Sequence, residues 1–318
     1  EVEISDILES YAKAEELERR RAYTLTFLAE NQKQTPELEK KIIAAETLNE
    51  LEDLFLPYKP RKRTKADKAR ESNLSPLAEY VVKELPPYDK AVIKAADFIC
   101  EHFSDAETAL AGALDIVTDD IASNAEIRKY GREELLRSDI TAAVKKGKES
   151  DGATYRDYFD FRERCEKIRG HRVMALLRGE KEEILSLSLQ PVKEEERILR
   201  EITHIAFRKS GELIEKCAKE AWKKYVKPSI EREIFNDIEI KAHIESADYF
   251  AKNLEKILLS APFGSKAVIG IDPGIRTGCK AAAVDEFGSF LKYETLFIHT
   301  NEREAEKLLT WIEKFNIK

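Results

Sequence analysis

The chain has 318 residues, of which 42% are hydrophobic and 36% are charged, and its formal net charge is −7. This length and hydrophobic content allow two or three folded domains and exclude a largely disordered chain. The high charge, with only 12 glycines and 10 prolines, favours long helices over a sandwich or barrel, so we expect a mainly α protein. Because the overall field repels phosphate, any contact with nucleic acid has to come from a local basic patch.

The cysteines give no indication of a zinc site or of a disulfide framework, because they lie far apart and form no C-x-x-C pair. They are Cys100, Cys165, Cys217 and Cys279. Reduced thiols predict a cytoplasmic protein. No apolar run approaches the roughly 20 residues that span a bilayer, and no signal-peptide pattern opens the chain. Both ends interrupt or directly follow helical patterns, so we expect the sequence to be a segment of a longer protein.

Residues 1–148 are predicted to form a helical array. Apolar residues from Ile4 to Leu28 keep helical spacing and predict one long amphipathic helix. Short connections favour helix-turn-helix packing of the helices that follow. Proline and capping patterns predict further helix starts at Thr35-Pro36, Thr47 with Glu50, Ser75-Pro76, Ser104 with Glu107 and Ser123 with Glu126.

Residues 149–262 are predicted to form a connector with a small β element and two long helices. The stretch from Gly147 to Arg178 is rich in aromatic and basic residues and reads as loop. Residues 183–189 alternate apolar and polar side chains, which predicts a strand and half of a small hairpin. Two helical patterns follow, at about 194–226 and 229–260, and Lys227-Pro228 is expected to separate them.

Residues 263–318 change to a period of two. Strands are predicted at 267–271, 280–284 and 290–298, and glycine-bearing turns between them predict an antiparallel meander. Asn301 with Glu304 then predicts a capped helix that ends near Phe315. A helix in that place is typical of a crossover to further strands.

The strongest basic cluster lies between Pro57 and Arg70, next to Tyr58, and has a single acidic residue, Asp67. Lysine and arginine neutralise phosphates without needing base geometry, so the cluster is a candidate contact for the backbone of RNA or DNA. A solvated loop between acidic helices is the alternative, and both readings stay open here. The candidate binding residues are Lys59, Arg61, Lys62, Arg63, Lys65, Lys68 and Arg70.

A second candidate lies in the sequence AVIGIDPGIRTGCK at residues 267–280, where a strand delivers Asp272 into a glycine-rich turn. Such a carboxylate can serve as a metal ligand or general base, but a phosphodiester hydrolase needs at least two more to hold two cations. The chain offers no obvious set. The turn can instead seat an anion on backbone N–H groups, or be purely structural. The candidates for an anion-binding turn are Gly274, Arg276, Thr277, Gly278 and Lys280.

The five histidines show no ligand spacing, and only His171, beside Arg172 in the aromatic and basic stretch, stands out. Packing or capping remains the favoured interpretation for His171. No phosphate-binding loop or G-x-S-x-G nucleophile motif occurs. We therefore expect neither a cofactor nor a metal.

Four segments together resemble the bacterial Tex family of transcription accessory proteins, which are similar to eukaryotic transcription-elongation factors, and the resemblance covers nearly the whole chain. They are LEDLFLPYKPRKRTKADKARESNLSPLAEY at 51–80, YRDYFDF at 155–161, HRVMALLRGEKEEIL at 171–185 and VIGIDPGIRTGCK at 268–280. The resemblance implies a helical region with helix-turn-helix character, followed by the first part of a YqgF/RuvC-like domain of RNase H fold. It also implies helix-hairpin-helix modules and an RNA-binding OB-fold beyond this sequence.

The resemblance also bears on Asp272. In resolvase-like nucleases the acid of the first strand is a metal ligand, and Asp272 matches that position. In Tex the partner carboxylates are not kept as a set, which implies a nuclease-derived scaffold, and Asp272 is then a vestigial candidate. In the family the OB-fold is the main nucleic-acid binder. Partner carboxylates, and that module, would lie beyond Lys318.

Three functions follow as expectations. The first is a non-enzymatic, nucleic-acid-associated transcription accessory scaffold that binds RNA or DNA weakly and without strong sequence preference. The second is a metal-dependent nuclease of the Holliday-junction-resolvase type built on Asp272. The third is a scaffold that binds proteins of the transcription or translation machinery through its helices. None of these involves a membrane.

Overall fold

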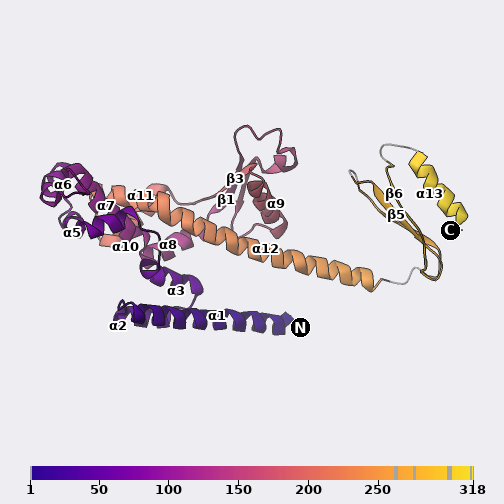
Figure 1. The fold of residues 1–318 in the computed structure, drawn as a ribbon, viewed down its shortest axis with the longest axis horizontal. Helices are drawn as coiled ribbons and strands as arrows, with labels where there is room; N and C mark the ends of the chain where they lie inside the picture. Colours follow the sequence, from indigo (N-terminus) through magenta and orange to yellow (C-terminus); the bar gives the residue numbers. More distant parts are fainter. Residues whose placement is uncertain (1, 261–263, 275–276, 299–302, 316, 318) are drawn as a thin grey trace. The chain divides into compact units, whose positions relative to one another are not determined.

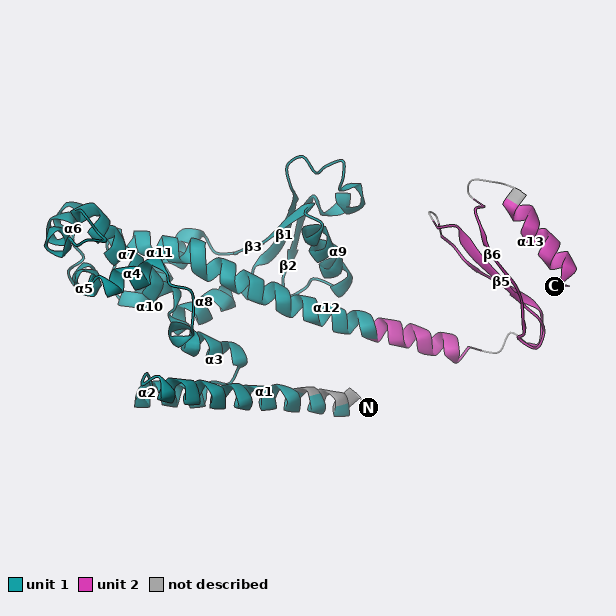
Figure 2. Ribbon diagram, viewed as in Figure 1, with its two compact units in different colours: residues 1–247 teal, residues 248–318 magenta. Residues whose placement is uncertain are grey.

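The computed structural model describes residues 2–260, 264–274, 277–298, 303–315 and 317. The chain divides into two compact units, residues 1–247 and residues 248–318, each described here by itself (Figure 2). Within the described residues, no helix combines the length and the apolar character needed to cross a membrane.

The first unit begins with eight helices in succession (Figure 1). Short 3-10 turns at Leu56–Tyr58 and Ala96–Phe98 lie between some of them. The helices are α1 (Val2–Glu30), α2 (Pro36–Ala44), α3 (Leu48–Phe55), α4 (Lys65–Glu71), α5 (Ser75–Glu84), α6 (Tyr88–Ala95), α7 (Ala106–Ala122) and α8 (Ala125–Leu136). The predicted helical array, including one long first helix, is therefore confirmed.

Helices α1, α2 and α3 share a small core of their own. Leu28 of α1, Ile42 of α2 and Leu51 of α3 are all fully buried in it. The start of α2 follows the predicted pattern, because the Thr35 hydroxyl accepts a hydrogen bond from the backbone N–H of Leu38 and Pro36 occupies the first helical position.

Helix α7 is the centre of the main core, and α4, α5, α6 and α11 (Glu212–Ala221) all pack against it. Its sequence is apolar on most sides, which is typical of a helix surrounded by others. Gly112 allows close approach, because a Cβ there would lie 2.7 Å from side-chain atoms of Leu74 and Phe103.

Two helix starts lie one residue later than the sequence predicted. The N-cap of α7 is Asp105, whose carboxylate accepts from the backbone N–H of Thr108 at 2.8 Å, and not Ser104. The N-cap of α8 is Asn124, which accepts from Glu126 and Ile127, and not Ser123. Neighbouring serine and Asx residues offer alternative caps, and the choice follows which of them has extended backbone dihedrals.

A three-stranded antiparallel sheet follows the array, in the order β2-β1-β3. Its strands are β1 (Asp139–Val144), β2 (Asp160–Arg164) and β3 (Leu185–Gln190). Strand β3 was expected, but its partner β1 lies in the part read as helical, and β2 and α9 (Gly170–Lys181) lie in the part read as loop. Because β1 pairs on both sides, its stability comes from residues distant in sequence that a local pattern does not show.

The helices after the sheet differ from the two that were expected. They are α10 (Glu195–Phe207), α11 and α12 (Lys227–Leu258). The break comes at Arg208, which ends α10 in a left-handed conformation with φ 53°. No break occurs at Pro228, because a π-helical turn at Trp222–Val226 precedes it. The wider turn rearranges the hydrogen bonds that the proline ring would otherwise disrupt.

The second unit contains the predicted antiparallel meander, β4 (Val268–Asp272), β5 (Cys279–Val284) and β6 (Phe290–Leu296), in the order β4-β5-β6. Helix α13 (Arg303–Lys314) follows, and the predicted cap residue Asn301 lies outside the described residues. Ala281, Ala283, Leu296 and Trp311 form the core between the sheet and α13. These elements agree with the expected start of an α/β domain.

The three-part division drawn from the sequence stays a prediction. Strand β1 lies before residue 148 and its partners β2 and β3 lie after it, so that one sheet joins the first two predicted parts. Leu189 of β3 also donates its backbone N–H to Glu231 of α12 at 2.8 Å, which ties the sheet to that helix.

Candidate nucleic-acid interface

The basic segment, residues 57–70, begins in the 3-10 turn at Leu56–Tyr58, continues without regular structure to Thr64, and ends within α4. A capping box starts the helix: the Thr64 hydroxyl accepts from the backbone N–H of Asp67, and the Asp67 carboxylate accepts from the backbone N–H of Thr64. Asp67, the single acid of the segment, therefore stabilises the start of α4. Tyr58 packs against the core of the first three helices, which leaves it unsuited to stacking on a base.

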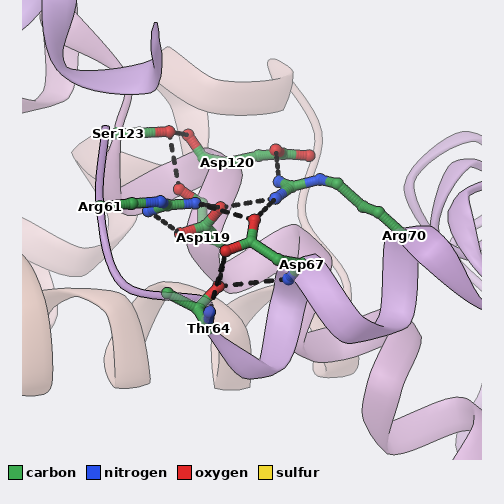
Figure 3. Close-up of polar contacts among 7 residues, drawn as sticks. All are labelled: Arg61, Thr64, Asp67, Arg70, Asp119, Asp120 and Ser123. Atoms are coloured by element: carbon green, nitrogen blue, oxygen red, sulfur yellow. Dashed lines mark hydrogen bonds and ion pairs between the residues drawn. The ribbon is translucent and has the colours of Figure 1, made fainter. Parts of the chain in front are cut away.

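Two arginines of the segment are bound to the end of α7 (Figure 3). Both terminal guanidinium nitrogens of Arg61 donate to the Asp119 carboxylate at 2.8 Å. Arg70 donates to Asp119 at 2.8 Å and to Asp120 at 2.7 Å. Asp119 thus holds residues that lie 58 and 49 positions away in the sequence. Such paired, charge-assisted hydrogen bonds fix both position and orientation.

The electrostatics of this cluster explain its arrangement. Asp119 and Asp120 lie in the last turn of α7, where the helix dipole disfavours negative charge and no basic residue of the helix itself offsets it. Desolvation raises the pKa of Asp119, but hydrogen bonds and charges from Arg61 and Arg70 outweigh it and lower the pKa overall. The hydrogen bonds to Asp119 likewise raise the pKa of Arg61. The two arginines therefore supply the positive charge that the C-terminal end of α7 lacks.

Two more cations of the segment also have acidic partners. Arg63 forms an ion pair with Glu71, and the Lys59 ammonium lies 3.6 Å from the Glu52 carboxylate. The Arg63–Glu71 pair is exposed and Lys59 is exposed beside a half-buried Glu52, and such pairs near the surface contribute little to stability. They nevertheless reduce the positive potential that the sequence alone suggested.

Three lysines carry the remaining charge. Lys62, Lys65 and Lys68 are exposed, and within the described part of the chain none has a carboxylate within 4.0 Å. Lys65 opens α4 and Lys68 lies one turn later. Of the seven predicted binding residues, four therefore form ion pairs within the protein, and three are available to a phosphate.

The second candidate, Asp272, lies at the exposed end of β4 and pairs in register with Lys280 of β5. The turn between them uses glycine for steric reasons. A Cβ on Gly274 would lie 2.5 Å from the carbonyl oxygen of Gly278, and Gly278 has φ 79°. Thr277 is exposed, and Arg276 lies outside the described residues. The glycines thus have a structural explanation, and an anion-binding role stays a prediction.

The donor set around Asp272 does not fit a metal centre of the two-cation kind. Among the residues that the structure describes, no group of three histidines, cysteines, aspartates or glutamates is placed to hold a metal ion. The cross-strand neighbour of Asp272 is a lysine, whose charge competes with a cation. Two-metal hydrolysis requires several converging carboxylates.

His171 lies on the surface at the start of α9. Arg172 next to it forms an ion pair with Glu163 of β2, with the Arg172 and Glu163 side-chain atoms 2.7 Å apart. The contact joins α9 to the sheet, which gives Arg172 a structural role.

Two family descriptions match the chain. "Tex central region-like" matches residues 87–250, and "Tex protein YqgF-like domain" matches residues 266–318. The first covers the end of the array, the sheet and most of α12, and the second covers the meander and α13.

Similar proteins come from bacteria and from man. "Protein tex" of Bordetella pertussis is 38% identical over 89% of this chain and 38% of its own length. "Transcriptional accessory protein Tex" of Neisseria gonorrhoeae is 32% identical over 100% of this chain and 43% of its own. Human "S1 RNA-binding domain-containing protein 1" is 25% identical over 87% of this chain and 29% of its own. The chain spans less than half the length of these relatives, and it belongs to the Tex family.

Proposed function

We propose that this chain contributes to a nucleic-acid-associated transcription accessory protein and that it contacts the phosphate backbone of RNA or DNA. The observation that carries the proposal is the set of three exposed lysines at α4, Lys62, Lys65 and Lys68, on a segment fixed to α7 by Arg61 and Arg70. The names of the bacterial and human relatives, which refer to transcription and to RNA binding, agree with it.

The structure favours weak, sequence-independent contact. Lysine ammonium groups act as point charges on phosphates, and the segment offers no aromatic platform or arginine fork free to read a base edge. The net charge of −7 opposes binding elsewhere. The role requires no catalysis. We also propose a cytoplasmic location, with which the four free thiols agree.

Replacing Lys62, Lys65 and Lys68 together by glutamine is expected to weaken binding to a labelled single-stranded RNA of about 20 nucleotides. Removing three phosphate contacts should lower the slope of log K against log salt by about 2 and the affinity by roughly tenfold or more. Fluorescence anisotropy across a salt series measures both quantities.

The matched control replaces three other exposed lysines, Lys33, Lys40 and Lys90, by glutamine, which changes the net charge equally. It should leave the slope unchanged. If the two triple variants bind alike at low salt, the lysines of α4 are not the contact.

The nuclease alternative receives a separate test. We expect no metal-dependent cleavage of branched DNA by the chain, because the described residues do not assemble the required carboxylates around Asp272. Cleavage that appears with Mg²⁺ or Mn²⁺ and disappears in Asp272→Asn would establish the alternative instead. Protein partners from the transcription or translation machinery are a further possibility that a pull-down resistant to nuclease treatment would reveal.

A further inference from the structure

A basic hollow of about 870 Å³ lies between α10 and α11, on a part of the surface that the basic segment does not include. The turn that joins the two helices contributes part of its lining. Its cationic lining residues are Arg200 on α10, Arg208 and Lys209 in the turn, and Lys216 and Lys219 on α11.

The cations of this hollow outnumber its acids and form no close ion pair among the described residues. All five cations are exposed, and within the described residues none has a carboxylate within 4.0 Å. Two acids, Glu196 and Glu215, also line the hollow, and Glu215 accepts a hydrogen bond from Ser210. This is the opposite of the arrangement at Asp119, where arginines are fully engaged with acids.

The charges are also held by ordered structure. Ile198 and Ile202 of α10 and Leu213, Ile214 and Cys217 of α11 are buried in the main core, so both helices are anchored on their inner faces. Arg208 has φ 53°, a left-handed conformation in which glycine is the usual residue. The Arg208 side chain is exposed at the hollow, and the backbone at this position would also accept glycine.

We propose that the hollow between α10 and α11 binds phosphates of a nucleic-acid strand, as a second contact besides the lysines of α4. The identification of the polyanion as nucleic acid rests on the proposed function. Unpaired lysine and arginine side chains attract successive phosphates without regard to sequence. No Phe, Tyr or Trp side chain lines the hollow, and the imidazole of His204 is the one ring in its lining, so we expect the hollow to hold the backbone and not a run of stacked bases.

The test uses the whole chain and the variant Arg208→Gly/Lys209→Gln/Lys216→Gln. Glycine suits the left-handed position, so this variant should retain the thermal midpoint of the wild type. Binding to the same single-stranded RNA should lose about 2 units of salt slope and roughly tenfold or more in affinity. Tripolyphosphate binding, measured by calorimetry, should be lost in this variant and retained in the Lys62, Lys65 and Lys68 variant.

The outcomes separate the two proposals. If the Arg208→Gly/Lys209→Gln/Lys216→Gln variant binds RNA like the Lys33, Lys40 and Lys90 control, the hollow is not a nucleic-acid site, even if the α4 variant is weakened. If the hollow variant is weakened and the α4 variant binds RNA like the control, the hollow is supported as a contact and the lysines of α4 are not a contact. If poly-glutamate displaces tripolyphosphate from the wild type more effectively than RNA does, the hollow binds an acidic protein segment, which overturns the nucleic-acid assignment.

Discussion

Asp53→Asn should lower the free energy of unfolding of the first unit by about 3 kcal/mol, because it removes the carboxylate of a buried ion cluster. Asp53 of α3 is 3% exposed and accepts from Arg128 at 2.5 Å and from Arg132 at 2.8 Å, both on α8. Without it, two guanidinium groups would keep their desolvation penalty and lose a charge partner. Glu233 of α12, which lies 2.5 Å from Arg132, would compensate in part.

Urea unfolding followed by circular dichroism measures this loss, and hydrogen exchange in α3 and α8 shows where it acts. The control Asp97→Asn removes the acid of an exposed pair with Lys94 and should change stability by about 0.5 kcal/mol or less. Equal effects of the two substitutions would show that the Asp53 cluster contributes no more than a surface pair.

Asp119→Asn should cost about 2 kcal/mol at neutral pH, because it weakens the charge-assisted hydrogen bonds from Arg61 and Arg70 together. The basic segment should then separate from α7 more readily. Hydrogen exchange in residues 57–71 should increase, and the urea midpoint should fall. Asp120→Asn is the matched control one residue away, and it should cost less, because Asp120 bonds Arg70 alone.

The dependence on pH follows from the opposite shifts of the two acids. The pKa of Asp119 is lowered from 3.8, so its stabilisation is present above that value and is lost as the pH falls through the folded-state pKa. Desolvation, with the charge of Asp119, raises the pKa of Asp120, so ionising Asp120 opposes folding above 3.8. The stability difference between wild type and Asp119→Asn should therefore shrink below about pH 3.8. A difference that stays constant down to pH 2.5 would contradict this assignment.

Local patterns predicted the elements that depend on local interactions. The apolar spacing from Ile4 to Leu28 gave one helix, α1, because a helical stripe repeats within a few residues. The three strands of the second unit were predicted for the same reason, since their turns carry glycine and lie next to the strands they join. Family resemblance, carried by contiguous motifs, was likewise readable from the chain.

Elements that depend on distant partners were missed. Strand β1 is stabilised by β2 and β3, and its short run Asp139–Val144 closely follows the helical pattern of α8, so local spacing did not separate it from the array. The capping choice between Ser123 and Asn124 also depended on backbone geometry, because Asn124 is extended and Ser123 is in the helical region. The cations of the α10–α11 hollow are interspersed with glutamates in the sequence, so no basic run marked them.

The sequence by itself determined the mainly helical class, the meander near its end, the Tex family and the location of the densest positive charge. Only the tertiary structure decided which charges are available. It placed Asp119 against Arg61 and Arg70, left Lys62, Lys65 and Lys68 exposed, and brought five unpaired cations around one hollow. The reason is that Coulomb interactions depend on distance in space, and the carboxylate that accepts the 2.8 Å hydrogen bonds of Arg61 lies 58 residues away along the chain.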